Sequence, residues 1–196
     1  TKLTMKRKLM LIAAVLLLGL TNVKAQDLFS KGAIAVNANI GLGNYSGYNM
    51  GIPPLSLSAD VGVIDNLIGD NGSVGVGGYV GFATNSYTYN YYSNYYYKAT
   101  VTRMCFGVRG NFHYQLNDKL DTYAGLMLGL YTYSYSYKDN YNDDYYKNYY
   151  SNLNHSDIAF SAYVGTRYYF SRTMALNAEV GYGFTYISAG LTFKLK

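Results

Sequence analysis

The residue types best suited to catalysis stand together at His155, Ser156 and Asp157, which match the members of a hydrolytic triad. They precede a segment with strand periodicity, and consecutive residues of a strand point to opposite faces of its sheet. His155 and Ser156 would therefore lie on opposite sides. We interpret the run as a chance grouping at the start of a strand, and we expect no catalytic residue and no enzyme activity.

Three other features could hold a metal or a cofactor. His113 has no second His or Cys at ligand spacing, so a hydrogen bond inside the fold suits it better than a metal. The run from Gly75 to Gly81 resembles a dinucleotide-binding loop, but Val80 stands where the third glycine belongs and no helix follows. Cys105 is the single cysteine, which excludes an intrachain disulfide and a multi-cysteine metal site. We expect neither a metal nor a cofactor.

The first 25 residues have the layout of a signal peptide. A basic stretch begins at Met5, and the apolar run 9–20 is too short to span a bilayer as a helix. Small residues then occupy the positions that a signal peptidase reads, which predicts cleavage between Ala25 and Gln26. Residues 1–4 lie upstream of this signal. An uncleaved membrane anchor is the alternative.

The basic charge of the chain belongs mostly to this leader. The 196 residues include 16 Lys and Arg against 11 Asp and Glu, and five of the basic residues lie within 1–25. Residues 26–196 are therefore neutral overall and carry no basic cluster. A nucleic-acid partner is excluded, because such a protein needs a basic surface to neutralise phosphates.

After the leader, apolar residues alternate with small or polar ones, which is the period of a β-strand. Each alternating segment is near the 9–11 residues that a tilted strand needs to cross a bilayer. The eight segments are 33–43, 55–63, 74–82, 104–116, 120–130, 158–170, 174–182 and 187–195.

The connections between these segments support a membrane barrel. Those at 44–54, 84–98 and 131–157 are long, and those at 65–72, 117–119 and 171–173 are shorter; the tight one at 183–186 breaks the alternation. Only 14% of the residues are charged, whereas a soluble barrel would cover its outside with charge. We predict an all-β, eight-stranded, antiparallel up-and-down transmembrane β-barrel over 26–196, with its apolar set toward lipid.

The register of one hairpin supports a common membrane boundary. If Leu116 pairs with Leu120, Met104 faces residue 132. The apolar residues of the outward set then end at the same height on both strands, and Thr and Ser residues follow them. On the inward set we expect a polar cluster of Arg109, Arg167, Glu179 and His113. Pairing across 171–173 places Glu179 opposite Gly165, one diagonal step from Arg167. The cluster is either a plug that fills the lumen or a polar pathway through it, and we favour the plug.

The leader, the eight segments and the chain's end resemble the small outer-membrane β-barrels of diderm bacteria, the OmpX-like, OmpA-barrel-like and opacity-protein-like "porin family". The C-terminal residues Gly190, Phe193 and Leu195 resemble the assembly signal of that family. The resemblance implies outer-membrane lipid, including lipopolysaccharide, and the barrel-assembly machinery as partners, with periplasmic termini and extracellular long loops. It implies no single activity. Enzymes of this kind that modify lipid carry a catalytic His-x-Ser pair on their lipid face, and this chain lacks such a pair.

Tyrosine is concentrated in two of the long connections. Residues 84–98 hold seven of the 26 tyrosines and residues 131–150 hold nine. Tyrosine offers a large contact area and a hydroxyl at little entropic cost, as in antibody loops. The segments could bind a glycan or a host or cell-surface ligand, or they could be interfacial aromatics in a low-complexity loop. The candidate binding residues are Tyr89, Tyr92, Tyr96, Tyr135, Tyr145 and Tyr149.

Three function classes follow from these features. The first is a structural or adhesive surface protein that acts through its tyrosine-rich loops. A small-solute porin ranks lower, because eight strands leave an interior just wide enough for side chains. A lipid-modifying enzyme ranks last, since its residues are missing.

Overall fold

The computed structural model describes residues 28–43, 49–91, 95–139, 150 and 153–195. The expected signal peptide at 1–25 and its cleavage site between Ala25 and Gln26 lie outside these residues, as do Tyr92, Tyr145 and Tyr149.

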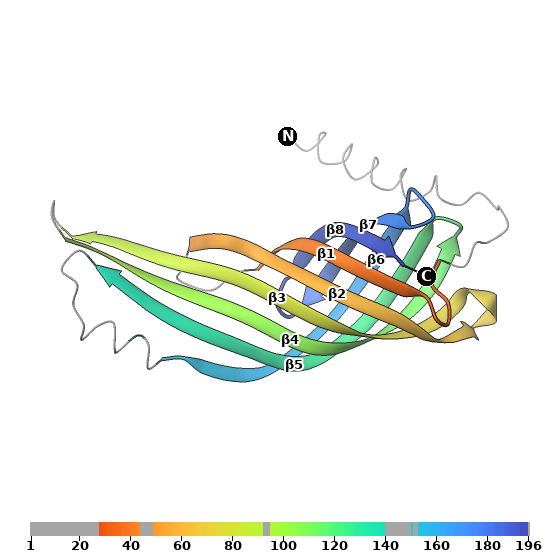
Figure 1. Ribbon diagram of the computed structural model, residues 1–196, viewed down its shortest axis with the longest axis horizontal. Coiled ribbons are helices and arrows are strands. Elements are labelled where there is room, and N and C mark those ends of the chain that lie inside the picture. The colour runs from red at the N-terminus through yellow and green to blue at the C-terminus, as the bar shows by residue number, and fades with distance from the viewer. Residues whose placement is uncertain (1–27, 44–48, 92–94, 140–149, 151–152, 196) are drawn as a thin grey trace, which may run out of the picture.

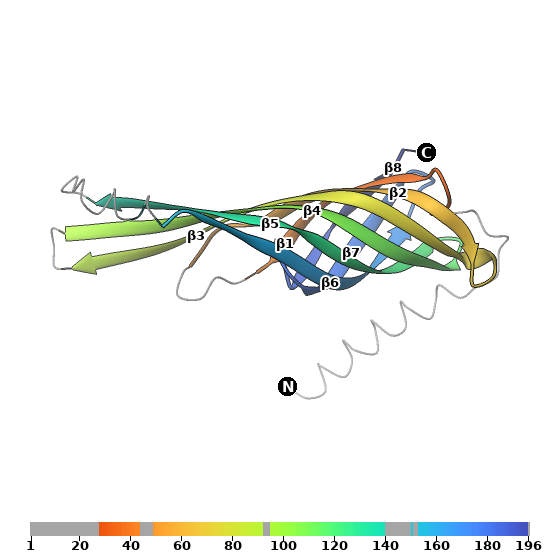
Figure 2. The same ribbon diagram turned by 90° about the horizontal axis from the view of Figure 1, so that it is seen from below.

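The described strands form a closed antiparallel barrel (Figures 1 and 2). Each strand pairs with its neighbours in the sequence, and the first strand closes the ring with the last. A short 3-10 helix, η1 (Gly69–Asn71), lies in one connection. Within the described ranges, no helix is both long enough and apolar enough to cross a membrane. The strands are β1 (Ile34–Leu42), β2 (Asn49–Leu67), β3 (Gly72–Tyr91), β4 (Tyr95–Asn117), β5 (Leu120–Asp139), β6 (His155–Tyr169), β7 (Met174–Tyr182) and β8 (Ile187–Lys194).

Side chains alternate between the lumen and the outer surface. On β4, Val108 is 69% exposed and the next residue, Arg109, is 3% exposed. Every buried residue within the eight segments predicted above belongs to the set predicted to face inward, which confirms that assignment. Apolar side chains thus cover the outside and polar ones fill the inside, the reverse of a soluble barrel.

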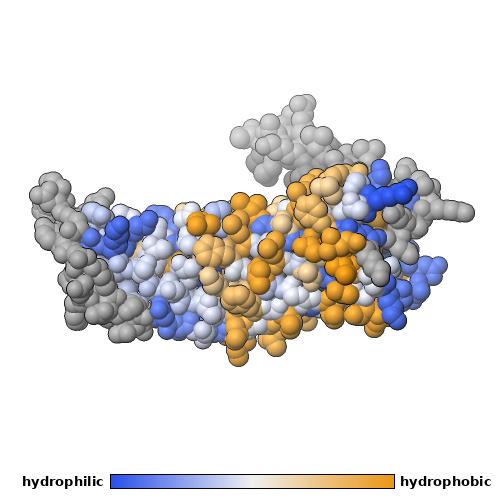
Figure 3. Space-filling view, viewed as in Figure 1, coloured by the Kyte–Doolittle hydropathy of each residue, from blue (hydrophilic) through white to orange (hydrophobic). Residues whose placement is uncertain are grey.

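The apolar outer surface has the height of a bilayer core. On β5 it runs from Leu120 to Leu130, about 33 Å along the strand and about 25 Å when the strand is tilted as in membrane barrels. Figure 3 shows apolar residues gathered over the barrel and hydrophilic ones over the far ends of the long strands. The molecule is a transmembrane β-barrel.

The long strands continue well beyond this apolar belt. Within the segments 84–98 and 131–157, predicted as long connections, residues 84–91, 95–98, 131–139 and 155–157 are strand: β3 and β4 pair as far as Tyr91 and Tyr95, and β5 reaches Asp139. Apolarity ends where the lipid ends, but the backbone ladder continues because Tyr, Thr and Ser sustain strand pairing in water. We call residues 49–53, 83–91, 95–103 and 131–139 the extension. Figures 1 and 2 show β3, β4 and β5 projecting past the shorter strands.

Strand register agrees with the sequence along most of the β4–β5 hairpin. Met104 pairs with Thr132, as predicted. Near the turn the register shifts, and Leu120 pairs with Asn117 rather than with Leu116. The side chain of Asn117 accepts a hydrogen bond from the backbone N–H of Lys119 at 2.9 Å, which tightens this turn.

We expect Leu126→Arg, near the middle of the apolar belt, to lower the free energy of unfolding by about 2–4 kcal/mol, because the substitution places a charge in lipid. Leu126 is 58% exposed on the outer surface of β5. The matched control is Ser136→Arg on the same face of β5 beyond the belt, where we expect a change within about 0.5 kcal/mol. Urea unfolding in phosphocholine vesicles measures both variants. Equal costs at the two positions would contradict the membrane belt.

Candidate functional site

A buried network of charged residues crosses the lumen. Asp60 of β2 lies at its centre: Arg167 of β6 donates from Nη2 to its Oδ2 at 2.6 Å. Nε of Arg109, on β4, lies 3.2 Å from Oδ1 of the same carboxylate. Asn111 also donates to Oδ1, at 2.9 Å. One carboxylate therefore joins three strands through two arginines and an amide.

Glu179 of β7 pairs with Arg109 rather than with Arg167. Nη2 of Arg109 donates to Oε1 of Glu179 at 2.7 Å, and the Tyr123 hydroxyl donates to the same oxygen at 2.7 Å. The predicted register is right, since Glu179 stands opposite Gly165. The suggested diagonal neighbour was the wrong partner, because Arg167 reaches across the lumen to Asp60 instead.

His113 closes the network at the end with the short turns, which we call the turn end. Its Nδ1 lies 3.0 Å from Oδ2 of Asp121, and that oxygen also accepts a 3.4 Å hydrogen bond from Arg167. The imidazole stacks on the ring of Phe29 with 4.0 Å between centroids. The described residues include no group of three His, Cys, Asp or Glu that could hold a metal ion.

Residues before the first strand close the turn end. Leu28 and Phe29 are buried inside it, although no strand period marks them. The backbone N–H of Leu28 donates to Oε1 of Gln115 at 3.0 Å, and the carbonyl of Phe29 accepts from the Ser73 hydroxyl at 2.8 Å. Gly75 of the glycine-rich run lies under the Phe29 ring, and a Cβ added at Gly75 would come within 2.8 Å of that ring. Gly75 therefore has a packing role in this run.

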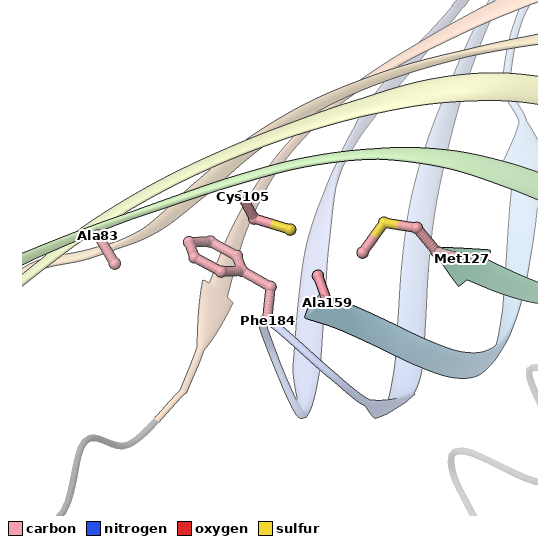
Figure 4. Packing of buried hydrophobic residues seen from close by; sticks show 5 residues of the cluster. All are labelled: Ala83, Cys105, Met127, Ala159 and Phe184. Atoms are coloured by element: carbon pink, nitrogen blue, oxygen red, sulfur yellow. The ribbon is translucent and has the colours of Figure 1, made fainter. Parts of the chain in front are cut away.

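A second aromatic side chain closes the lumen from the other end. Phe184, in the turn between β7 and β8, packs among Ala83, Cys105, Met127 and Ala159 (Figure 4). Gly183 before it has φ 145°, a conformation that suits glycine. Between Phe184 and the network remains a cavity of about 30 Å³, with room for about two water molecules.

Sequence reasoning named both arginines, Glu179 and His113 but missed part of the network. Asp60 and Asp121 lie on the inward set as well, and the signal for them was available: a carboxylate on that set needs a cation within reach. Leu28 and Phe29 carried no periodic signal.

The inner face of the extension is covered with tyrosine. Tyr87, Tyr89, Tyr97, Tyr131, Tyr133, Tyr135 and Tyr137 continue the inward set of β3, β4 and β5, and we call them the tyrosine face.

Their rings form two groups of neighbouring aromatics, one of Tyr87, Tyr89, Tyr97 and Tyr137 and one of Tyr131, Tyr133 and Tyr135 with His155. Ring centroids are 5.6 Å apart between Tyr89 and Tyr97, and 5.6 Å apart between Tyr97 and Tyr137. The ring of Tyr150 also stacks on Tyr137, with 5.1 Å between centroids. The opposite face of the same strands presents Ser and Thr side chains with Lys98 and Lys138.

The predicted tyrosines divide between these faces. Tyr89 and Tyr135 belong to the tyrosine face, whereas Tyr96 pairs with Asn90 and lies on the opposite face. Tyr89 and Tyr96 are equally exposed, at 40% and 41%.

A cavity of about 160 Å³ lies at the foot of the tyrosine face, directly above Phe184. We call it the Arg103 pocket; its walls include Arg103, Tyr131, Tyr133, Tyr182 and Tyr186. The guanidinium carbon of Arg103 lies 5.5 Å from the centroid of the Phe184 ring. Sequence analysis missed Arg103, which directly precedes the segment 104–116; continuing the alternation of that segment by one residue places Arg103 on the inward set.

His155, Ser156 and Asp157 do not form a triad. Nε2 of His155 lies 3.3 Å from Oδ2 of Asp157, and its ring stacks on Tyr133 at 4.6 Å. Ser156 pairs with Thr132 on the outward face, away from the imidazole.

The proposed assembly residues lie on β8 and just after it. Gly190 is on the inward set, where a Cβ would meet the backbone of Ala38. Phe193 and Leu195 face outward and are 38% and 68% exposed. Their role in assembly stays a prediction.

No family model matches the chain, and no curated protein matches it either. Among solved structures it is similar to a designed transmembrane β-barrel, with 15% identity over 85% of this chain and 98% of that one and a TM-score of 0.48. The attachment invasion locus protein Ail of Yersinia pestis has 12% identity over 84% of this chain and 95% of its own, with a TM-score of 0.42. The N-terminal barrel domain of OprF from Pseudomonas aeruginosa has 13% identity over 84% and 98%, with a TM-score of 0.40.

We expect Asp60→Ala to lower the free energy of unfolding by about 3–5 kcal/mol, because it leaves two buried arginines without a shared carboxylate. Ser188→Ala removes a buried inward group that makes none of the contacts described above, and we expect it to cost less than about 1 kcal/mol. Urea unfolding in vesicles gives both values. A small cost for Asp60→Ala would mean that the network does not hold the lumen together.

Proposed function

We propose that this protein is an outer-membrane surface protein whose barrel anchors a ligand-binding tyrosine face outside the cell. The observation that carries the proposal is that two groups of neighbouring tyrosine rings lie on one face of strands that leave the apolar belt. A barrel that served the membrane alone needs aromatics at the boundary, not beyond it. From Met104 to Tyr95, β4 continues for nine residues, or about 30 Å.

The two ends of the barrel differ in a way that supports an orientation. The turn end has tight connections and holds the buried residues Leu28 and Phe29, while the opposite end carries the extension. Short periplasmic turns and long extracellular segments are the pattern of outer-membrane barrels. We place the termini in the periplasm, with residues 1–25 removed as a signal peptide and Gly190, Phe193 and Leu195 read by the assembly machinery.

The filled lumen favours this function over a porin. Phe29 and Phe184 close its two ends, and the arginine–carboxylate network lies between them. The described residues assemble no catalytic set, so we propose binding and not catalysis. Tyrosine suits binding because it contributes a large rigid surface and a polar hydroxyl.

We expect the protein to fractionate with the outer membrane and to migrate faster on a gel before boiling than after it. A closed barrel resists detergent at room temperature, because its backbone hydrogen bonds form an unbroken ring. Recovery in the soluble periplasm without a heat-dependent shift would overturn the anchor role.

We expect bacteria that display the double variant Tyr87→Ser/Tyr89→Ser to be retained about tenfold less on a binding surface, because two exposed rings of the tyrosine face are lost. Retention is counted on pectin, on gelatin and on cultured epithelial cells, against bacteria without the protein. Tyr96→Ser is the matched control, since it removes an equally exposed ring from the opposite face of β4. Unchanged retention of the double variant, or an equal loss in the control, would contradict binding by the tyrosine face.

A further inference from the structure

We propose that the Arg103 pocket binds the carboxylate of an acidic saccharide whose neighbouring sugar rings lie on the tyrosine face. This inference rests on the proposed function and adds to it the class of ligand and the residue that selects it. The pocket provides one cation among aromatic walls, and the tyrosine face starts at two of those walls, Tyr131 and Tyr133.

Arg103 supplies the charge and the geometry for a carboxylate. Its side chain is held among aromatic rings and is 8% exposed, so water competes little with a bound anion. A guanidinium carries five N–H donors in a planar fork, which matches the two oxygens of a carboxylate. Five donors also allow Arg103 to hold a ligand while it keeps contacts within the protein.

The charges around the pocket suit one carboxylate group of a ligand. Asp157 stands opposite Tyr131 on the adjacent strand, but its carboxylate is engaged with His155 at 3.3 Å. Asp139 is six residues beyond Tyr133 along β5, or about 20 Å. Arg109 and Arg167 lie below Phe184 and are bonded to their own carboxylates. Arg103 is therefore the cation that an anion entering this pocket meets.

Aromatic rings lead away from the pocket along the extension. Tyr133 stacks with His155 at 4.6 Å, and His155 with Tyr135 at 5.9 Å. The C–H faces of sugar rings pack on such surfaces while their hydroxyls reach phenol groups and water. Tyr87 pairs with Ala99, which is four residues from Arg103 along β4. Arg103 and the level of Tyr87 are therefore about 13 Å apart, a distance that a tetrasaccharide spans.

The test is calorimetric titration of the full barrel in phosphocholine nanodiscs with two matched probes, tetragalacturonic acid and its uncharged methyl ester. We expect the acid to bind at least tenfold more tightly than the ester. Arg103→Gln should remove that preference by lowering the affinity for the acid to that for the ester, and Arg103→Lys should retain part of the preference, because an ammonium lacks the planar fork. Arg103 lies beyond the apolar belt, and heat-dependent gel migration verifies that each variant is folded.

The outcomes separate this inference from the function on which it rests. Equal binding of acid and ester, lost in Tyr87→Ser/Tyr89→Ser, would overturn the role of Arg103 and leave the tyrosine face as a sugar-binding surface. No binding of either probe, with cell retention intact, would overturn the ligand class alone. No binding and no retention would overturn both. If phosphatidylglycerol added to the nanodiscs abolishes binding of the acid in the wild type, the pocket takes a lipid headgroup, and the saccharide proposal is wrong.

Discussion

The closed ring of backbone hydrogen bonds is the constraint on which the rest of this structure depends. In lipid, each backbone N–H and C=O must find a partner within the protein, and a sheet achieves this only when its first and last strands pair. The pairing of β1 with β8 closes the ring, with Val36 opposite Phe193. Closure then assigns every second side chain to lipid and every other one to a narrow lumen, so the two sets must differ in chemistry.

The lumen shows the cost of that assignment. Polar side chains that point inward leave bulk water and must satisfy one another. Asp60 forms ion pairs with both Arg167 and Arg109. Glu179, on β7, forms a second ion pair with Arg109. Phe29 and Phe184 cover the two ends of the network. The interior therefore stabilises the barrel, and the binding function that we propose belongs to the surface beyond the membrane.

The same alternation continues past the membrane, where the side chains on both faces change in chemistry. The inward set of β4 passes from Arg109 and Cys105 to Arg103 and Tyr97 without a change of face. The outward set passes from Phe106 and Met104 to Thr102 and Thr100. One sheet thus changes from a barrel wall with a lipid side to a projecting surface with a tyrosine side. The Arg103 pocket lies at this transition, because Phe184 closes the lumen just below it.

Periodicity in the sequence was enough to determine which face each strand residue takes, the number of strands and most of the register, as with Met104 opposite Thr132. These properties are local, since a period of two and the length of a turn define them. The ends of the long strands, the choice of Glu179 by Arg109, and the burial of Leu28 and Phe29 were decided by the tertiary structure. Each depends on which side chains meet across the lumen or on whether a neighbouring strand continues to pair. The spacing of residues along one strand does not give the distance between side chains that face each other across the barrel.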